Sequence, residues 1–587
     1  MSMRVGARQV GLTVSRQTIR PTTCLAPTTS TRPFSAVTRQ ENMERLAQEE
    51  FDLLIIGGGI TGVAIARDAA MRGFRTALVE KGDFGSGTSS RSTRLIHGGI
   101  RYLEYGEFKL VFDACSERRV FRQIAPRLVR PLPFLWPLYR GQRPASWKPR
   151  VGMILYDALS LFRNVQRHRW MSPSEAQRRE PLVAGRGLLS VGRYYDAQVD
   201  DARLTLATAK AAHFHDAVIV NYARVVGLMK AGGSVVGAQV MDELWDSVGS
   251  PSPNREVEVR AKVVVNATGI WADGIRDLDE HHERPMIRST KGIHLLLPRA
   301  RLSSQHAVIF SVPRDGRHIF LIPWNEFTLV GTTDTDFEGD LDNPAATRDD
   351  VEYLLEAVQR TFPGAQIESG DVISTFAGLR PLVFAPGSPS ARSRAHVIVK
   401  DESGLITLVG GKLTISRLMA EQLTDCVQKR LAEEFGVHAQ SGCRTKEPLE
   451  TAQIGRVPVS SVDDAVSKHL VKAYGGDAAW VLAYAEENPS LAKRIVPGLP
   501  YLMGEALYAV QHEMALTLCD VLIRRTHVIC ETRDGGLEHA RVVAELMARR
   551  LGWNEEEIER QVSDYIAQVA LAHQWREPER RHDKGCY

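Results

Sequence analysis

The chain has 587 residues, of which 43% are hydrophobic, 25% are charged and 7% are aromatic. This composition is typical of a globular protein of about two to four domains, and it excludes a mostly disordered chain, a collagen and a multi-pass membrane protein. The seven cysteines lie apart and form no CxxC pair, so we expect neither a disulfide framework nor a bound metal.

The first 40 residues form a segment of their own. They contain six Arg, twelve Ser or Thr, and no Lys, Asp or Glu. Because the whole chain has a net charge of only +4, its remainder is close to neutral, and no nucleic-acid partner is expected. An Arg-rich, acid-free start predicts a mitochondrial transit peptide over residues 1–41, with Arg32 two residues before Phe34 as at a matrix-protease cleavage site. A disordered basic tail is the alternative interpretation.

A nucleotide-binding unit follows this segment. Residues 51–56 (FDLLII) and 76–79 predict two buried strands, and residues 63–72 between them have helical spacing. The glycines of the intervening G-x-G-x-x-G turn let the backbone approach a pyrophosphate at the helix N-terminus; they are Gly57, Gly59 and Gly62. Glu80, directly after the second strand, can accept hydrogen bonds from a ribose diol, which favours FAD or NAD over NADP.

Three further segments favour FAD. Residues 85–92 (GSGTSSRS) offer hydroxyl and backbone N–H groups to a second part of the ligand. Residues 263–269 (VVVNATG) predict a buried strand that ends in small residues. Residues 405–414 (LITLVGGKLT) predict a strand, a Gly-Gly turn and the start of a helix, whose positive dipole end suits a flavin ring.

The chain resembles the FAD-dependent glycerol-3-phosphate dehydrogenases of the mitochondrial, quinone-linked type. The matching blocks run in the family's order between about residues 51 and 530, and include GTSSRSTRLIHGGIRYLE, YYDAQVDDARL, VVNATGIWAD, GTTDTDFEGD, AGLRPL, LVGGKLT and HEMALTLCDVLIRR. The resemblance implies an α/β (α+β) fold, with an FAD-binding Rossmann-like domain interleaved with an antiparallel-sheet substrate domain over residues 42–445, and a C-terminal α-helical domain over residues 446–587. Short predicted strands agree with this, at residues 218–226, 237–241, 257–264, 319–322 and 328–330.

The resemblance also implies FAD as the cofactor. Its contacts are expected from the glycine turn, the acid after the second strand, the small polar run and the late Gly-Gly turn. The expected cofactor residues are Gly57, Gly59, Gly62, Glu80, Lys81, Thr88, Ser89, Ser90, Ser92, His97, Val225, Ala267, Gly269, Gly411, Lys412, Leu413 and Thr414.

The implied reaction is oxidation of sn-glycerol 3-phosphate to dihydroxyacetone phosphate by hydride transfer to FAD, with roles in the glycerol-3-phosphate shuttle and in glycerol catabolism. A small dianionic substrate requires cations of fixed geometry, and the planar fork of Arg380 is expected to be the main phosphate clamp. The other residues expected at the substrate are Arg101, Tyr102, Lys412, Arg394 and Lys291.

A general base must accept the proton of the C2 hydroxyl. His97 and His294 are both candidates, because histidine titrates near the working pH. Each also has a purely structural interpretation: His97 as a residue that only contacts the flavin, and His294 as a buried strand histidine. The choice between them stays open at this point.

The implied electron acceptor is ubiquinone, so the enzyme is expected at the surface of the mitochondrial inner membrane, facing the intermembrane space, as a peripheral protein. Residues 127–169 mix Arg and Lys with Phe, Trp and Tyr, which suits an interfacial anchor, although a partly buried loop with a basic rim has the same composition. Two other functions stay open: a related oxidase that reduces oxygen or acts on an amino acid, and a flavin-bound assembly factor. A homodimer is also left open.

Overall fold

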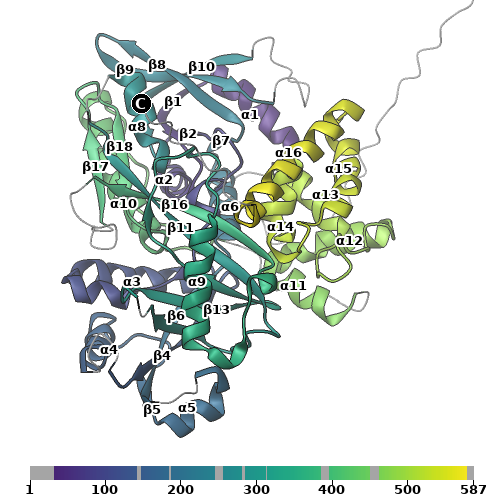
Figure 1. Ribbon diagram of the computed structural model, residues 1–587. Helices are drawn as coiled ribbons and strands as arrows, with labels where there is room; N and C mark the ends of the chain where they lie inside the picture. Colours follow the sequence, from purple (N-terminus) through teal and green to yellow (C-terminus); the bar gives the residue numbers. More distant parts are fainter. Residues whose placement is uncertain are drawn as a thin grey trace, which may run out of the picture.

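The computed structural model describes residues 32–141, 147–183, 187–244, 255–280, 284–312, 314–384, 395–449 and 462–577. Figure 1 shows that the described chain forms two sheets with their covering helices, and a separate group of helices from its last third. Within these residues, none of the helices combines the length and the apolar character needed to cross a bilayer.

The first sheet has eight strands, and its parallel centre is built around β1 (Glu50–Ile56). β1 pairs in parallel with β2 (Thr76–Val79) on one side and with β10 (Glu256–Asn266) on the other. The sheet is completed by β7 (Val218–Val220), β8 (Ala223–Ala231), β9 (Ser234–Asp242), β17 (His396–Lys400) and β18 (Ile406–Gly410). Alternate residues of β1 belong to two different apolar clusters, which is why FDLLII is apolar throughout.

Helices cover both faces of this sheet. On one face, α2 (Ile60–Met71) packs between α6 (Asp201–Phe214) and α10 (Ser416–Phe435). On the other face lies α1 (Ala36–Gln48), which contacts β7 and β10. The expected order of strand, glycine turn, helix and strand is therefore confirmed in β1, α2 and β2.

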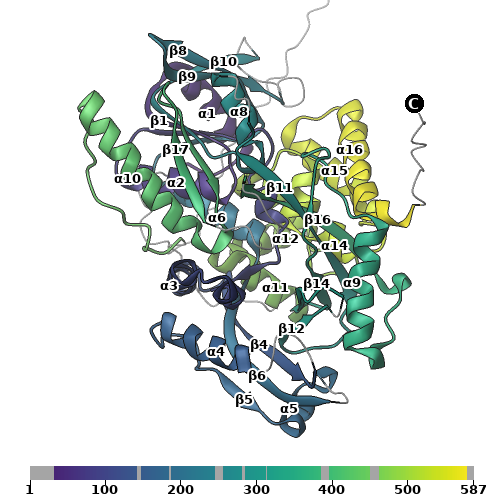
Figure 2. The same ribbon diagram turned by 60° about the vertical axis from the view of Figure 1, so that its left-hand side comes forward.

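The second sheet has ten strands and is mainly antiparallel. Its long strands are β4 (Val129–Tyr139), β6 (Leu188–Val199), β11 (Ile287–Pro298) and β16 (Ser374–Val383). The shorter ones are β3 (Leu95–Ile96), β5 (Arg169–Met171), β12 (Ala307–Ser311), β13 (His318–Trp324), β14 (Phe327–Gly331) and β15 (Thr335–Asp336). The apolar side of α9 (Arg348–Thr361) packs against this sheet, while α3 (Phe108–Ile124), α4 (Trp147–Leu159) and α5 (Pro173–Arg179) lie near β4 and β6 (Figure 2).

The two sheets alternate along the chain, which confirms the interleaved architecture. The chain forms β1 and β2, crosses to the second sheet for β3–β6, returns for β7–β10, crosses again for β11–β16 and returns for β17 and β18. The strands predicted at residues 218–226, 237–241 and 257–264 extend the first sheet, and those at 319–322 and 328–330 lie in β13 and β14 of the second.

The start of the described chain packs on the fold. The ring of Phe34 is buried beside that of Phe84, and both Nη atoms of Arg39 donate to the buried carboxylate of Asp242. The boundary predicted at residue 41 therefore falls inside α1. Residues 1–31, which hold most of the predicted transit peptide, lie outside the described residues.

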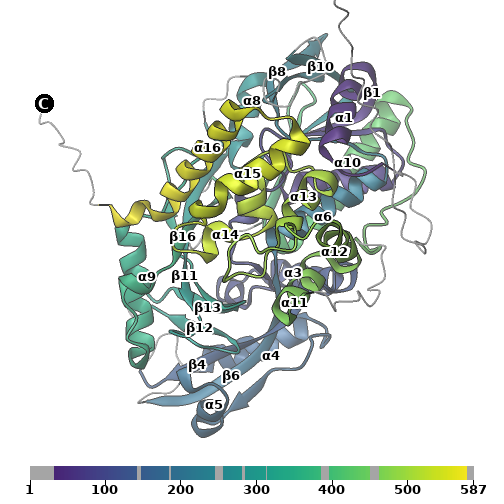
Figure 3. The same ribbon diagram turned by 90° about the vertical axis from the view of Figure 1, so that its right-hand side faces the viewer.

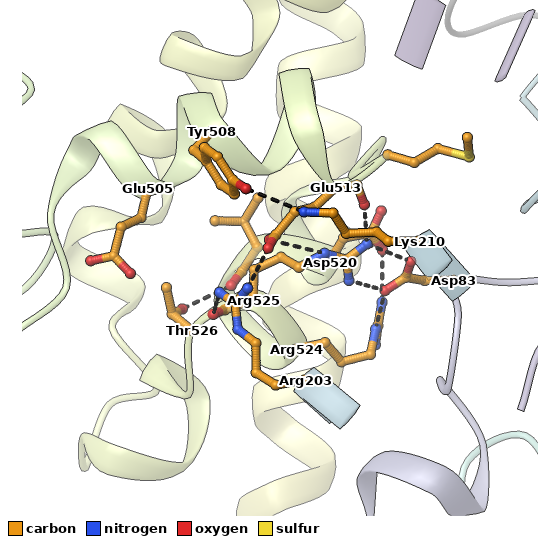
Figure 4. A network of polar contacts seen from close by, with 12 residues as sticks. Asp83, Arg203, Lys210, Glu505, Tyr508, Glu513, Asp520, Arg524, Arg525 and Thr526 are labelled. Carbon is orange, nitrogen blue, oxygen red and sulfur yellow. Dashed lines mark hydrogen bonds and ion pairs between the residues drawn. The ribbon is translucent and has the colours of Figure 1, made fainter. Parts of the chain in front are cut away.

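The last third of the chain is helical, as expected. It contains α11 (Asp464–Tyr474), α12 (Ala478–Glu487), α13 (Met503–His512), a π-helical turn (Asp520–Arg525), α14 (Val528–Glu531), α15 (Leu537–Leu551) and α16 (Glu555–His573), which Figure 3 shows packed along the two sheets. A buried polar network joins these helices to the first sheet (Figure 4). At its centre, Asp83 accepts hydrogen bonds from Arg524 and Arg525, so each of these buried charges has a partner.

Candidate active site

The glycine turn between β1 and α2 forms a tight cradle. Gly57 has a φ of +110°, and a Cβ atom there would lie 2.8 Å from the carbonyl oxygen of Ala267. A Cβ atom on Gly62 would lie only 1.8 Å from the carbonyl oxygen of Gly57, so α2 begins in direct contact with the turn. Any larger residue at either position would displace the backbone that surrounds the N-terminus of α2.

Glu80 closes the far side of this turn. Its two carboxylate oxygens accept hydrogen bonds from the backbone N–H groups of Gly58 (2.6 Å) and Gly82 (2.8 Å). Burial raises the pKa of Glu80 above its usual value. A carboxylate oxygen can accept more than one hydrogen bond, so Glu80 retains capacity for a ribose diol.

A cavity of about 430 Å³ extends from this turn along the ends of the first sheet's strands. Twelve of the seventeen expected cofactor residues line it: Gly57, Gly59, Glu80, Lys81, Thr88, Ser89, Val225, Ala267, Gly269, Gly411, Lys412 and Leu413. Of the others, Gly62 packs against the turn, Ser92 donates its hydroxyl to Asp201, and Ser90 is not among the described residues that line this cavity.

A second cavity, of about 250 Å³, adjoins the first. The two share a wall that includes Thr88, Ser89, Gly411, Lys412 and Leu413. A ligand in the first cavity that extends along this wall therefore reaches the second. The second cavity is lined by three more of the expected cofactor residues, Ser92, His97 and Thr414. It is also lined by the expected substrate residues Arg101, Tyr102, His294, Arg380 and Lys412.

The second cavity is strongly positive. Among the described residues that line it are five basic side chains and one carboxylate, that of Asp334. Sequence reasoning missed several of these residues, namely Arg91, Arg317, His318, Phe320, Thr332 and Asp334. An excess of cations in a partly enclosed cavity attracts a small anion.

Arg380 has a fixed orientation in this cavity. Its Nη1 donates to the Asp334 carboxylate (3.1 Å), and its Nη2 donates to the Thr332 hydroxyl (3.0 Å) and the Thr333 carbonyl (3.1 Å). The guanidinium lies over Gly292 of the neighbouring strand β11, where a Cβ atom would come within 2.0 Å of Nη2. These contacts hold the guanidinium of Arg380 at the wall of the second cavity.

Lys291 does not belong to this site. Its Nζ lies 2.7 Å from the carboxylate of Asp350 on α9 and donates to the Ala345 carbonyl. Successive residues of β11 point to opposite faces, so His294 and Gly292 face the cavity and Lys291 faces α9. Arg394, the other predicted contact, lies outside the described residues.

The two candidate bases differ in their surroundings. One ring nitrogen of His294 lies 2.9 Å from the Thr93 hydroxyl, and its ring stacks on Phe376, while burial together with Arg380 and Arg94 lowers its pKa to about 3. The backbone N–H of His97 donates to the Thr414 hydroxyl, and its ring lies edge-on to Phe320. Burial together with Lys412 and Arg101 holds the pKa of His97 well below its usual value.

Lys412 connects the two cavities. Its Nζ is buried and has no hydrogen-bond partner among the described residues, and it lies 4.7 Å from the ring centroid of Tyr102. Burial lowers the pKa of Lys412. A buried ammonium group without a partner is costly unless a ligand supplies acceptors. Together with the glycine cradle, this group fits a dinucleotide that carries acceptors at the shared wall, as FAD does.

The sequence matches two protein families. Residues 52–426 match the family described as FAD dependent oxidoreductase, and residues 405–558 match the C-terminal domain of alpha-glycerophosphate oxidase. The chain is 38% identical over 558 residues to a glycerol-3-phosphate dehydrogenase of Mycobacterium leprae, covering 92% of each chain. It is 36% identical to the aerobic glycerol-3-phosphate dehydrogenase of Bacillus subtilis, covering 89% of this chain and 95% of the relative.

The fold is also that of a solved structure. The glycerol-3-phosphate dehydrogenase from Bacillus halodurans, complexed with FAD, superimposes with a TM-score of 0.75 at 31% identity, covering 93% of this chain and 99% of that one. The similarity therefore extends through the two interleaved domains and the C-terminal helices.

Proposed function

We propose that this chain, which belongs to the FAD-dependent glycerol-3-phosphate dehydrogenases, oxidises sn-glycerol 3-phosphate to dihydroxyacetone phosphate and passes the electrons to ubiquinone. The observation that carries the substrate assignment is the second cavity, where five cations surround a space adjoining the FAD cavity. A phosphate dianion satisfies this charge, and an uncharged alcohol does not.

The basic residues of the second cavity have two roles: binding the phosphate and stabilising negative charge beside the flavin. Arg380 binds the phosphate with its fork, and Arg101 adds a second cation from the turn after His97. When bound, FAD supplies the hydride acceptor for the substrate's C2 carbon. Lys412, at the shared wall, stabilises negative charge on either side of it.

His97 is the better candidate for the general base. A base must be neutral before it accepts a proton, and burial with Lys412 and Arg101 lowers the pKa of His97, which favours its neutral ring. His294 is neutral too, but one of its ring nitrogens already contacts Thr93 and its face is covered by Phe376. We assign the structural role to His294 and the proton to His97.

Turnover with a panel of substrates and acceptors tests this function. We expect reduction of a short-chain ubiquinone analogue with glycerol 3-phosphate as donor, and no comparable rate with glycerol or with amino acids. Peroxide release in step with substrate consumption would instead identify an oxidase. A yellow protein that turns over none of these substrates would favour the assembly-factor alternative.

We further propose that the exposed face of α4 binds the membrane in which the quinone lies. Trp147, Val151 and Ile154 recur at helical spacing and are 61%, 52% and 59% exposed. Figure 2 shows α4 beside α3 at one end of the molecule, and other exposed apolar side chains on or near these helices are Tyr105, Phe108, Phe112, Leu161 and Phe162. Lys148 and Arg150 add positive charge, which suits anionic lipid headgroups.

The double substitution Trp147→Asp and Ile154→Asp is expected to reduce binding to cardiolipin-containing liposomes by about tenfold or more, because each aspartate opposes insertion into the lipid interface. Flotation of the purified protein measures the bound fraction. The matched control is Val542→Asp with Ile566→Asp, which changes exposed apolar residues of α15 and α16. Equal flotation of both double variants would contradict a role for α4.

The Arg-rich, acid-free start of the chain supports a mitochondrial location, with the enzyme on the inner membrane facing the intermembrane space. In that location the reaction would serve the glycerol-3-phosphate shuttle and glycerol catabolism. A reporter carrying residues 1–40 should be imported by isolated mitochondria, and a reporter that stays outside would contradict this address.

A further inference from the structure

A buried polar cluster lies behind the turn that carries His97. The backbone N–H of Gly98 donates to two acceptors, the hydroxyl of Tyr156 (2.9 Å) and the carboxylate of Asp196 (3.1 Å). Neither side chain is among the described residues that line the two cavities, and both are buried. They therefore contact the turn from the side opposite the substrate cavity.

Arg118 completes this cluster, which we call the Gly98 anchor. Tyr156 donates its hydroxyl proton to Asp196 (2.6 Å), and Arg118 donates to the Tyr156 hydroxyl (2.8 Å) and to the Asp196 carboxylate. The three side chains come from three elements, α3, α4 and β6. All are buried, so the carboxylate and the guanidinium satisfy each other away from water.

The anchor also fixes the shape of the turn by contact. A Cβ atom on Gly98 would lie 2.4 Å from both the Tyr156 hydroxyl and the Cys115 Sγ, so only glycine fits against the anchor. Gly99, with a φ of +75°, then turns the chain into the helical turn that carries Arg101 and Tyr102. The residues on both sides of Gly98 thus face the substrate cavity while the peptide between them is held from behind.

A buried network of this kind could serve stability alone. Two features indicate that it also positions the turn. Gly98 shares its one N–H proton between acceptors from two elements, Tyr156 of α4 and Asp196 of β6, so the peptide is tied to both elements. The restrained peptide directly follows His97, whose ring must approach the substrate hydroxyl within hydrogen-bond distance.

We propose that Tyr156, Asp196 and Arg118 are positioning residues that hold the His97–Gly98–Gly99 turn so that the His97 ring is aligned with the substrate hydroxyl. This inference rests on the proposed function and adds residues to it that touch neither substrate nor cofactor. Arg118 also places a positive charge near His97, in addition to Lys412 and Arg101, which supports a neutral ring at that position.

The test is Tyr156→Phe, followed by anaerobic stopped-flow reduction of the flavin with glycerol 3-phosphate. The variant loses one acceptor for Gly98 and one contact to Asp196 but keeps the aromatic ring. We expect the limiting rate of flavin reduction to fall about tenfold, since small misplacements of a catalytic group have effects of this size or larger. The full flavin amplitude, the FAD content and the apparent substrate Kd should stay near the wild-type values.

The rate constant separates positioning from stability. A purely structural role lowers the fraction of flavin that can be reduced and leaves the rate constant of the folded fraction unchanged, and that outcome would overturn the inference. Tyr565→Phe is the matched control, because it removes another buried tyrosine hydroxyl, bonded to the Gly535 carbonyl in the C-terminal helices. Asp196→Asn provides a second variant and should also slow reduction at full amplitude.

The same experiment distinguishes this inference from the proposed function. A wild-type flavin that stays oxidised contradicts the proposed function, and the inference fails with it. A wild-type flavin that is reduced, with Tyr156→Phe and Asp196→Asn at the same rate, overturns the inference alone.

Discussion

The substitution Arg380→Ala is expected to raise the KM for glycerol 3-phosphate by about 100-fold or more, because hydrogen bonds from an ionised donor to phosphate are among the strongest in proteins. The FAD content should not change, since Arg380 lines the second cavity rather than the glycine cradle. Steady-state kinetics over a wide substrate range, together with the visible flavin absorbance of the purified variant, measure both quantities.

Two variants control this experiment. Arg380→Lys keeps the charge but loses the planar fork, so its KM should lie between those of the wild type and Arg380→Ala. Arg301→Ala removes an exposed arginine that pairs with Asp371, and it should leave the KM unchanged. If Arg380→Ala has the wild-type KM, Arg380 does not bind the phosphate.

The second large effect is expected at His97. The substitution His97→Asn should lower kcat by about 10²- to 10⁴-fold, the usual contribution of a general base. In the wild type at saturating substrate, kcat should stay constant as the pH falls through the ordinary histidine range of about 6.5, because the lowered pKa keeps His97 neutral there. The quantity kcat/KM also reports the second ionisation of the substrate's phosphate, at a pKa of about 6, so kcat is the measurement that isolates His97. It should fall only when the pH drops below the lowered pKa of His97.

A substitution at Lys412 tests whether neighbouring positive charge lowers the pKa of His97. Lys412→Met removes a neighbouring positive charge that disfavours the imidazolium form of His97, so the pKa of His97 should rise. The acidic limb of the kcat profile should therefore move to higher pH, in addition to any loss of rate. His294→Asn serves as the control and should leave the acidic limb in place. If His294→Asn shifts or removes the acidic limb while His97→Asn leaves it in place, His294 and not His97 is the base.

The local parts of the fold and of the site could be predicted from the sequence. The unit of β1, the glycine turn, α2 and β2 is continuous in the chain, and its hydrophobic periods and turn glycines determine it directly. The interleaving of the two sheets could not be derived from periodicity and was predicted through the family resemblance. Parallel pairing of β1 with β10 joins residues some 200 positions apart, and no local pattern encodes that pairing.

One site residue was predicted wrongly and several were missed, and each case has a physical cause. Lys291 and His294 are three positions apart in one strand, so they must lie on opposite faces, and the period of two could have excluded one of them. Arg317 and His318 reach the cavity at the start of β13, where no motif marks them. Asp334 follows β14 within the block GTTDTDFEGD, but that block was matched as a whole and no site residue was predicted from it. Tyr156 and Asp196 contact Gly98 over sequence separations of 58 and 98, and no local sequence pattern predicts contacts over such separations.

The boundary predicted at residue 41 rests on composition alone. The composition of the first 40 residues is uniform in its lack of acids, so it gave no sign that Phe34 and Arg39 have partners in the folded chain. Residue 41 lies within α1, while the candidate cleavage site at Arg32 comes before the first buried ring, and the end of the transit peptide stays a prediction.

Anaerobic titration of the purified yellow protein with sn-glycerol 3-phosphate tests the central claim most directly. That claim is a bound flavin beside a cationic cavity that holds this substrate for oxidation. We expect the oxidised flavin absorbance to disappear with one equivalent of substrate per flavin consumed and dihydroxyacetone phosphate formed, and glycerol to have no such effect. A colourless folded protein, or a yellow one whose spectrum glycerol 3-phosphate leaves unchanged, would contradict the account.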